Sequence, residues 1–279
     1  MRIRLDIAYD GTHFRGWARQ PGLRTVQGTL EAAIARILGG DPRLVVAGRT
    51  DAGVHAAGQV AHLDLDAQQE SRLTPRRRGG ADPVSDLAHR IRGVLGAYAD
   101  ATVHRVSVAP EGFDARFAAV WRRYAYRVAD ESLAYDPLER ARTTTARGRL
   151  DVAAMDAAAR SLVGLHDFAA YCKPRPEATT IRTLLEFDWT RDEAGILVAN
   201  VKADAFCHSM VRGLVGACVA VGAGRLAPAA LARLRDDAQR TSAFAVLAAR
   251  GLTLTEVGYP ADDLLGARAE QTRARRDQE

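Results

Sequence analysis

The sequence of 279 residues is poor in cysteine and has no long apolar run. Its cysteines are an odd number without a Cys-x-x-Cys pair, which argues against a disulfide framework and a zinc site. They are Cys172, Cys207 and Cys218. The first residues lack the apolar stretch of a secretory signal peptide. The longest apolar segment, Met210 to Ala223, is interrupted by Arg212 and is shorter than the roughly 20 residues that a membrane span needs. We therefore expect a soluble protein of the reducing cytoplasm.

Lysine is nearly absent from the basic residues. Of the 39 lysines and arginines only two are lysines, Lys173 and Lys202, so the other 37 are arginines. Guanidinium groups bind phosphates in bidentate fashion and stack on bases, which favours a nucleic-acid partner. A genome rich in G and C also favours arginine whatever the function, and the modest net charge of +5 does not decide between the two explanations.

The motifs that hold common cofactors are missing as well. The sequence contains neither of the glycine-rich phosphate loops, GxxxxGK[ST] and GxGxxG, and no Gly-x-Ser-x-Gly elbow. The seven histidines are scattered, and His55 and His62 have no other ligand at a suitable spacing. We expect neither a metal nor a nucleotide cofactor, so any chemistry rests on carboxylates and arginines.

Apolar residues make up 47% of the sequence, which is enough for a sizeable core. Their periodicity predicts an α+β protein with two similar halves, residues 1–110 and 111–262, each an antiparallel or mixed sheet flanked by helices, with a cleft between them that could hold an active site. The charged residues 263–279 are expected to be disordered. Strands are predicted at 2–10, 44–47, 58–66, 102–108, 124–128, 181–190, 196–203 and 252–257. Helices are predicted to begin at Thr25, Asp82, Asp151, Ser209 and Pro228. The face that the second helix buries is expected to extend to Tyr98.

The most reactive side chains lie in the segment Gly48–His55, which reads Gly-Arg-Thr-Asp-Ala-Gly-Val-His. It joins two predicted strands, and in the second of these His62 faces away from the apolar side. A polar turn with a glycine on each side can hold a reactive side chain at the edge of a sheet. An ordinary hairpin, in which Asp51 and Arg49 form a solvated ion pair, explains the pattern as well and is favoured by composition alone.

Four other segments carry polar or aromatic side chains. From Phe113 to Tyr126 aromatic residues alternate with arginines, which suits stacking on unpaired bases and equally suits a strand with tyrosines in the core. Arg212 lies on the first turn of an otherwise apolar helix, where a cation needs a carboxylate from another segment. The loop Trp17–Gln27 is either a polar site or a hydrophobic anchor with exposed polar residues. The basic loop at residues 70–81 is either an RNA contact or a solvated insertion.

Taken in order, these segments form a pattern that covers residues 3 to about 260. The matching stretches are Tyr9-Asp10-Gly11, Gly16-Trp17 through Gln20, Thr25-Val26-Gln27, Gly48–His55, Gly58-Gln59-Val60, Phe113–Phe117, Arg123–Tyr126, Phe206–Gly213, Val215-Gly216 and Gly251-Leu252. This pattern resembles the tRNA pseudouridine synthase A family. The chain departs from the family at Ala18, where a polar residue is common, and at Ser209, where histidine is frequent. Both departures concern RNA contacts rather than the reacting residues.

The resemblance implies a pseudouridine synthase fold and an isomerase that needs no metal or cofactor. Members of the family convert uridine to pseudouridine in the anticodon stem-loop of tRNA, at positions 38, 39 and 40. They break the N1–C1′ glycosidic bond, rotate the uracil and rejoin it through C5. The resemblance also implies a homodimer in which one tRNA touches both subunits.

The resemblance assigns roles to five residues. Asp51 matches the catalytic aspartate, which either attacks C1′ or removes the C2′ proton, and Arg212 matches its basic partner. Tyr124 matches the tyrosine that stacks on the target base, and Arg49 matches the arginine that takes the place of the flipped base. Leu252 resembles an apolar wall of the pocket. On this basis Asp51 is expected to pair with Arg212, which leaves Arg49 able to reach the RNA.

Two other functions compete with this one. The first is a non-catalytic RNA-binding module on the same fold, which the presence of Asp51, Tyr124 and Arg212 disfavours. The second is a metal-dependent phosphoesterase that uses Asp51, Asp64 and Asp66, which the missing cluster of metal ligands makes remote.

Overall fold

The computed structural model describes residues 1–73, 82–175 and 179–277. Within them the chain forms two compact units, each with its own sheet and helices. Unit 1 comprises Met1–Val120 and the chain from Glu256 onward, and unit 2 comprises Trp121–Thr255. Most of the predicted basic loop, residues 74–81, lies outside the described residues, so its role stays a prediction.

The two units differ from the predicted halves because the end of the chain returns to unit 1. The amide of Val120 donates to the carbonyl of Gly258 at 2.9 Å, and the hydroxyl of Tyr259 donates to the carbonyl of Ala115 at 2.7 Å. These bonds attach the end of the last strand and the residue after it to the first unit. The first boundary therefore lies after Val120 rather than after residue 110.

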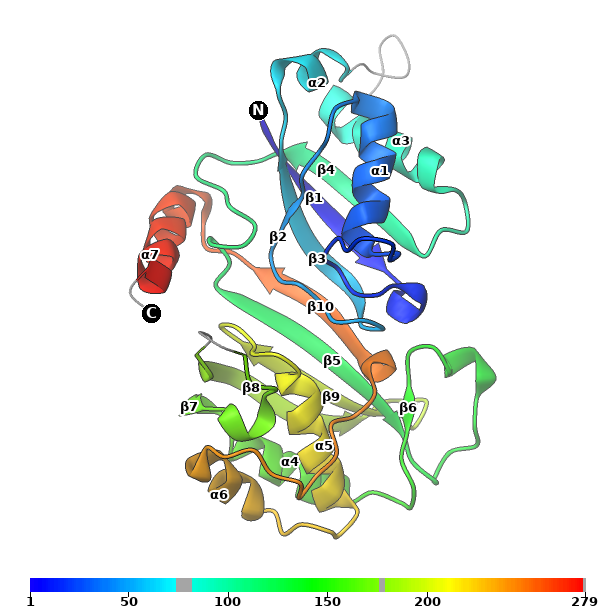
Figure 1. The fold of residues 1–279 in the computed structure, drawn as a ribbon. Coiled ribbons are helices and arrows are strands. Elements are labelled where there is room, and N and C mark those ends of the chain that lie inside the picture. Colours follow the sequence, from blue (N-terminus) through cyan, green and yellow to red (C-terminus); the bar gives the residue numbers. More distant parts are fainter. Residues whose placement is uncertain (74–81, 176–178, 278–279) are drawn as a thin grey trace. The chain divides into compact units, whose positions relative to one another are not determined.

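Unit 1 is built on an antiparallel sheet with β1 between β3 and β4, and β2 pairs with the other edge of β3. Helices α1 and α3 pack against each other on one face of this sheet (Figure 1). The elements are β1 (Arg2–Tyr9), α1 (Val26–Leu38), β2 (Val45–Val46), β3 (His55–Asp64), α2 (Ala67–Ser71), α3 (Pro83–Leu95) and β4 (Ala101–Val108). The predicted order of strands and long helices in the first half is confirmed.

The two long helices of unit 1 begin at the predicted capping residues. The Thr25 side chain accepts a hydrogen bond from a backbone amide of α1 at 3.3 Å, and the Asp82 side chain accepts one from α3 at 3.0 Å. Helix α3 ends at Leu95, because Gly96 follows with a φ of 100°. The prediction that its buried face extends to Tyr98 is therefore wrong, and the Tyr98 side chain is fully exposed.

A loop covers the β1–β3 pair on the face to which His62 points. The amide of Ala115 donates to Nδ1 of His62 at 3.0 Å, and the ring of Phe113 packs edge-on against the imidazole. His62 faces away from the apolar side as predicted, but this cover leaves it only 2% exposed. Burial and the nearby charge of Arg2 lower the pKa of His62, so the ring stays neutral near pH 7.

The C-terminal residues form helix α7 (Leu265–Asp277) instead of a disordered tail. Leu265 and Ala269, four residues apart on one face, are 1% and 2% exposed. On the same helix Arg273 donates to the buried carboxylate of Asp114 at 2.7 Å. The burial of these two apolar side chains and this ion pair help to hold a segment whose composition predicts disorder.

Unit 2 is also built on an antiparallel sheet, in the order β5-β9-β8-β7, with the short β6 parallel to β5. Helix α4 packs on β8 and on α5. The elements are β5 (Trp121–Ala129), β6 (Thr144–Thr145), α4 (Val152–Arg160), β7 (Gly164–Asp167), β8 (Ile181–Arg191), β9 (Leu197–Ala203), α5 (Met210–Gly222) and α6 (Ala230–Asp237). Strand β10 (Leu252–Gly258) leads out of this unit. Short 3-10 helices occur at Gly11–His13, Pro137–Glu139, Ala169–Tyr171, Ala249–Gly251 and Asp262–Leu264.

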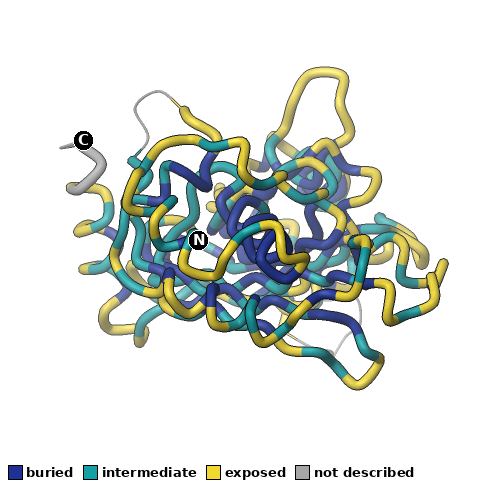
Figure 2. The backbone as a smooth tube through the Cα atoms, turned by 90° about the horizontal axis from the view of Figure 1, so that it is seen from below, coloured by how far each residue is buried: buried dark blue, intermediate teal, exposed yellow. Residues whose placement is uncertain are grey.

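Helix α5 is the core helix of unit 2. Every residue in it except Arg212 is buried, and Figure 2 colours the chain by this property. In the part of the chain that the structure describes, neither this helix nor any other is both long enough and apolar enough to span a membrane.

Two of the three cysteines form a disulfide, which the cysteine count argued against. Cys172 and Cys207 are bonded, with their Cα atoms 5.9 Å apart, and they lie 35 residues apart in the sequence. The bond joins the end of the 3-10 helix Ala169–Tyr171 to the loop before α5. Cys218 is the free and buried thiol. The expectation failed because an odd cysteine number excludes neither one bridge nor a single leftover thiol.

The disulfide between Cys172 and Cys207 predicts how many thiols react with a thiol reagent. Protein purified without reductant is expected to react with no thiol when folded and with one when denatured, because burial raises the pKa of Cys218 to about 12. Reduction should raise the count in the denatured protein to three and lower the free energy of unfolding by about 2–4 kcal/mol. A Cys218→Ala variant is the control and should show no thiol before reduction. Three thiols in the denatured, unreduced protein would rule out the bridge.

Candidate active site

The loop between β2 and β3 carries the candidate carboxylate. Along this loop exposure alternates, with Arg49 exposed, Thr50 only 6% exposed and Asp51 half-buried. Thr50 therefore points into unit 1, while its neighbours on either side reach the surface. A single buried side chain thus separates the two residues to which the sequence assigned RNA and ribose contacts.

Residues 14–17 hold the backbone of this loop. The amide of Trp17 donates to the carbonyl of Thr50 at 3.0 Å, and the amide of Gly53 donates to the carbonyl of Phe14 at 3.3 Å. Gly16 between them has a φ of 95°, and a Cβ there would lie 3.0 Å from the carbonyl oxygen of Thr50. The stretch Gly16-Trp17 thus supports the loop, and Trp17 itself is a core residue, 1% exposed.

Buried side chains of β1 and β3 contact the loop on its side that faces the core of unit 1. The hydroxyl of Tyr9 lies 2.7 Å from Oγ1 of Thr50, and Nε2 of Gln59 donates to that hydroxyl at 3.2 Å. Gln59 also donates to the carbonyl of Gly48 at 2.9 Å. Tyr9 and Gln59 belong to stretches that match the family pattern, but the resemblance assigned them no role. Their inward position in alternating strands was the available signal.

Tyr124 lies on the inward face of β5 and is 9% exposed. The ring of Phe206 meets it edge-on, with ring centres 5.1 Å apart and an angle of 89° between the planes. Tyr126, two residues on, is fully buried, while Arg123 is partly exposed and pairs with Glu186. The burial of Tyr124 and Tyr126 fits the strand with tyrosines facing the core, and the stacking of Tyr124 on a base stays a prediction. Phe206 is a neighbour of Tyr124 that sequence reasoning did not single out.

Arg212 is the polar exception in the apolar helix α5. Its Nε donates to the carbonyl of Leu247 at 2.6 Å, and Leu247 lies in the same unit. At the next position a Cβ on Gly213 would come within 2.4 Å of the carbonyl oxygen of Tyr171, so only glycine lets the helix pack this closely. The hydrogen bond of Arg212 and the close packing at Gly213 therefore fix the first turn of the helix in place. Its predicted pairing with Asp51, which lies in the other unit, stays a prediction.

Leu252 begins β10 and is 6% exposed. The segment before it is fixed by Tyr126, whose hydroxyl donates to the carbonyl of Ala248 at 2.7 Å and lies 3.0 Å from Oγ1 of Thr144. Burial raises the pKa of Tyr126, so this hydroxyl stays protonated at neutral pH. The buried apolar side chain of Leu252 is suited to form one wall of a pocket, but its place in a pocket stays a prediction.

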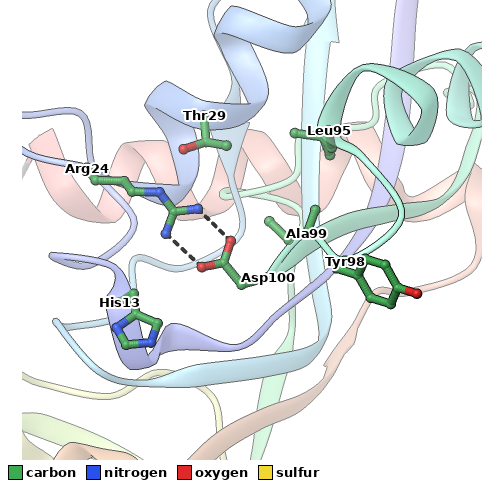
Figure 3. Close-up of a pocket in the computed structure, with 8 residues that line it drawn as sticks. His13, Arg24, Thr29, Leu95, Tyr98, Ala99 and Asp100 are labelled. Carbon is green, nitrogen blue, oxygen red and sulfur yellow. Dashed lines mark hydrogen bonds and ion pairs between the residues drawn. The ribbon is translucent and has the colours of Figure 1, made fainter.

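A pocket of about 320 Å³ in unit 1 contains none of the predicted site residues (Figure 3). The guanidinium of Arg24 and the carboxylate of Asp100 face each other in it through two hydrogen bonds, 2.6 and 2.7 Å long. The Arg24 guanidinium also lies 4.1 Å from the centre of the Phe14 ring. These contacts use the two charged groups of opposite sign in the pocket for structure, so their geometry indicates no chemistry.

The described residues contain no group of three His, Cys, Asp or Glu side chains placed to hold a metal ion. The ring atoms Nδ1 of His55 and of His62 each accept a backbone amide at 3.0 Å. Asp64 pairs with Arg2 at 2.6 Å, and the Asp66 side chain caps α2. The carboxylates that a phosphoesterase would share with Asp51 are therefore engaged elsewhere.

Comparison with known proteins agrees with the predicted family and fold class. The sequence model of a family described as tRNA pseudouridine synthase matches residues 7–76 and 158–260, so the matched class of protein is that of the tRNA pseudouridine synthases. A tRNA pseudouridine synthase A of Leifsonia xyli subsp. xyli is 61% identical over 283 residues, which cover 99% of this chain and 97% of that protein.

Two further relatives extend the comparison. The tRNA pseudouridine synthase A of Frankia casuarinae is 52% identical, with 98% of this chain and 95% of that protein covered. That of Cutibacterium acnes is 50% identical, with 99% and 95% covered. The chain belongs to the tRNA pseudouridine synthase A family. Members of this family are isomerases that convert uridine to pseudouridine in tRNA, and the predicted α+β class is that of their fold.

Proposed function

We propose that this protein converts uridine to pseudouridine in the anticodon stem-loop of tRNA, at positions 38, 39 and 40, with Asp51 as the catalytic carboxylate. The observation that carries the proposal is the placement of Asp51 beside the buried Thr50, on a loop tied to the core of unit 1 by backbone and side-chain hydrogen bonds. A carboxylate held in this way can face a ribose while the loop around it stays fixed.

Two roles for Asp51 remain open, attack on C1′ of the ribose or removal of the C2′ proton. Both need the ionised carboxylate, as in enzymes that cleave glycosidic bonds. We infer that Arg212 is its partner. Opposite charges about 4 Å apart attract by roughly 4 kcal/mol at an effective dielectric near 20, enough to fix the orientation of the carboxylate.

The remaining roles concern the flipped base. We infer that Tyr124 stacks on the target uracil, that Leu252 forms an apolar wall beside it, and that Arg49 fills the space that the base leaves. Extraction of the base costs a few kcal/mol of stacking and pairing. Phosphate contacts from the many arginines would offset this cost and would make tRNA binding weaken steeply with salt.

We also propose a homodimer in which one tRNA touches both subunits, and a cytoplasmic location, where tRNA is available. The support for the dimer is the family resemblance. The support for the location is the tRNA substrate that the family implies. The disulfide between Cys172 and Cys207 is unusual for a reducing compartment, so its state in the cell bears directly on this proposal.

The proposal is tested by mapping pseudouridine in tRNA from a strain that lacks the gene. Pseudouridine at positions 38, 39 and 40 is expected to disappear, to return with the wild-type gene, and to stay absent with the Asp51→Ala gene. Unchanged pseudouridine in the deletion strain would contradict the proposal. Purified protein that binds tRNA but forms no pseudouridine would instead support the alternative of a non-catalytic RNA-binding module.

A further inference from the structure

A buried chain of hydrogen bonds ends at Thr50, between the two residues that the proposed reaction uses. Tyr9 is 5% exposed and Gln59 is 0% exposed, so neither can exchange its partners for water. Gln59 lies on β3 and Tyr9 at the end of β1, and the register of these strands shifts between Ile7 and Tyr9. This register shift lies at the end of β1, next to Tyr9, whose hydroxyl contacts the loop.

The direction of the bonds follows from the donors available. Nε2 of Gln59 can only donate to the hydroxyl oxygen of Tyr9, so the single proton of Tyr9 is available for Oγ1 of Thr50. Burial raises the pKa of Tyr9 to about 12, so this proton is present throughout the neutral range. Thr50 then receives one directed bond on its side chain, in addition to the backbone bond from Trp17.

We propose that Tyr9 is a positioning residue whose hydroxyl, through Thr50, sets the orientation of both Asp51 and Arg49. This inference rests on the proposed function, because it gives Tyr9 a role only where Asp51 reacts. The backbone bonds of Trp17 and Gly53 hold the loop in place without Tyr9. Loss of the hydroxyl therefore shifts the loop by a fraction of an ångström and leaves the fold intact. Reaction rates are sensitive to shifts of that size.

A double-mutant cycle tests the bond between the two hydroxyls. Tyr9→Phe and Thr50→Val each remove one hydroxyl and keep the shape of the side chain. Each is expected to lower kcat about 10- to 100-fold in a tRNA transcript assay, with KM within about threefold of wild type. The double variant should be no slower than the slower single variant, because both changes break the same bond. Thr50→Ser, which restores the hydroxyl, should recover most of the rate.

Tyr171→Phe is the matched control. Tyr171 is 2% exposed and its hydroxyl donates to the carbonyl of Leu231 at 2.7 Å, and both residues lie in unit 2. This variant is expected to keep kcat within about twofold of wild type. Its loss of thermal stability should be similar to that of Tyr9→Phe, because each change removes one buried hydrogen bond. A Tyr9→Phe enzyme with wild-type kcat, effects that add in the double variant, or a Thr50→Ser enzyme as slow as Thr50→Val would overturn the inference.

The same assay separates this inference from the proposed function. Wild-type enzyme that forms pseudouridine, together with an inactive Asp51→Ala variant, establishes the reaction before Tyr9 is tested. If both results hold and Tyr9→Phe is fully active, only the positioning role fails. If the wild-type enzyme forms no pseudouridine, the proposed function fails first.

Discussion

Replacement of Asp51 with alanine is expected to lower the rate of pseudouridine formation by about 10⁴-fold or more. The carboxylate is the group that acts on the ribose in either proposed role, and no neighbouring acid on the loop can replace it. Binding of tRNA should change little, because most of its affinity comes from phosphate contacts elsewhere on the protein. Single-turnover assays with excess enzyme, combined with a measurement of tRNA affinity, separate the two effects.

Asp64→Asn is the matched control for this change. Asp64 lies in the same unit, pairs with Arg2 at 2.6 Å, and its side chain is 62% exposed. Its replacement is expected to keep the rate within about twofold of wild type, because exposed ion pairs contribute little. If Asp51→Ala retained its rate, or if Asp64→Asn were as damaging, the assignment of Asp51 as the catalytic carboxylate would be wrong.

The largest effect on stability is expected at Asp130 in unit 2. Its carboxylate is 0% exposed and accepts hydrogen bonds from Nη2 of Arg191 at 2.9 Å, from the amide of Leu150 at 3.0 Å and from Ser132. It thus links the end of β8 to the segment before α4. In Asp130→Asn the side-chain NH2 group would face N–H groups that also donate, so one of these hydrogen bonds is lost. Arg191 also loses the carboxylate with which it pairs. We expect a loss of about 3 kcal/mol in the free energy of unfolding at pH 7.

The pH dependence of this effect follows from the carboxylate. Burial raises the pKa of Asp130, but the hydrogen bonds from Arg191, Ser132 and Leu150 outweigh it and hold the pKa well below its ordinary range. A group with a depressed pKa stabilises the fold above its unfolded pKa of about 3.9, and this stabilisation is lost as the pH falls toward the folded pKa. The difference between wild type and Asp130→Asn should therefore shrink between about pH 4 and pH 2.

Urea unfolding followed by tryptophan fluorescence at pH 7 and at pH 3 measures both effects. Asp236→Asn is the control, because that side chain is 64% exposed and pairs with its neighbour Arg235. Its expected effect is below about 0.5 kcal/mol at either pH. If Asp130→Asn and Asp236→Asn destabilised the protein equally, the buried hydrogen bonds of Asp130 would not contribute as argued.

The parts of the fold that local chemistry determines could be predicted from the sequence. Thr25, Asp82 and Asp151 each accept a backbone amide of the helix that follows, as their residue types indicate. Elements that depend on distant contacts could not be predicted. The strands β6 and β7 are too short for a periodic signal, and α7 is held by a contact with Asp114, which lies 159 residues earlier. The pairing of Cys172 with Cys207 leaves no local signal either.

The candidate site divides in the same way. The segment Gly48–His55 could be recognised because its reactive residues are contiguous, and the loop lies between two strands as predicted. Its support could not be recognised, because the contact between Tyr9 and Thr50 depends on the register of β1 against β3 and on the shift within it. The burial of His62 likewise depends on a loop that is remote in the sequence. Tyr124, Arg212 and Leu252 lie in unit 2, and their approach to Asp51 remains the prediction that activity measurements test.

The central claim is that this chain rearranges uridine in the anticodon stem-loop of tRNA through Asp51. The most direct test is the release of tritium from tRNA transcripts labelled at C5 of uridine, with purified protein and an excess of metal chelator. Attachment of C1′ to C5 displaces the C5 hydrogen, so tritium should be released from transcripts with uridine at positions 38, 39 or 40. Transcripts with cytidine at all three positions should release none. No release from the uridine transcripts, or equal release from both sets, would contradict the account.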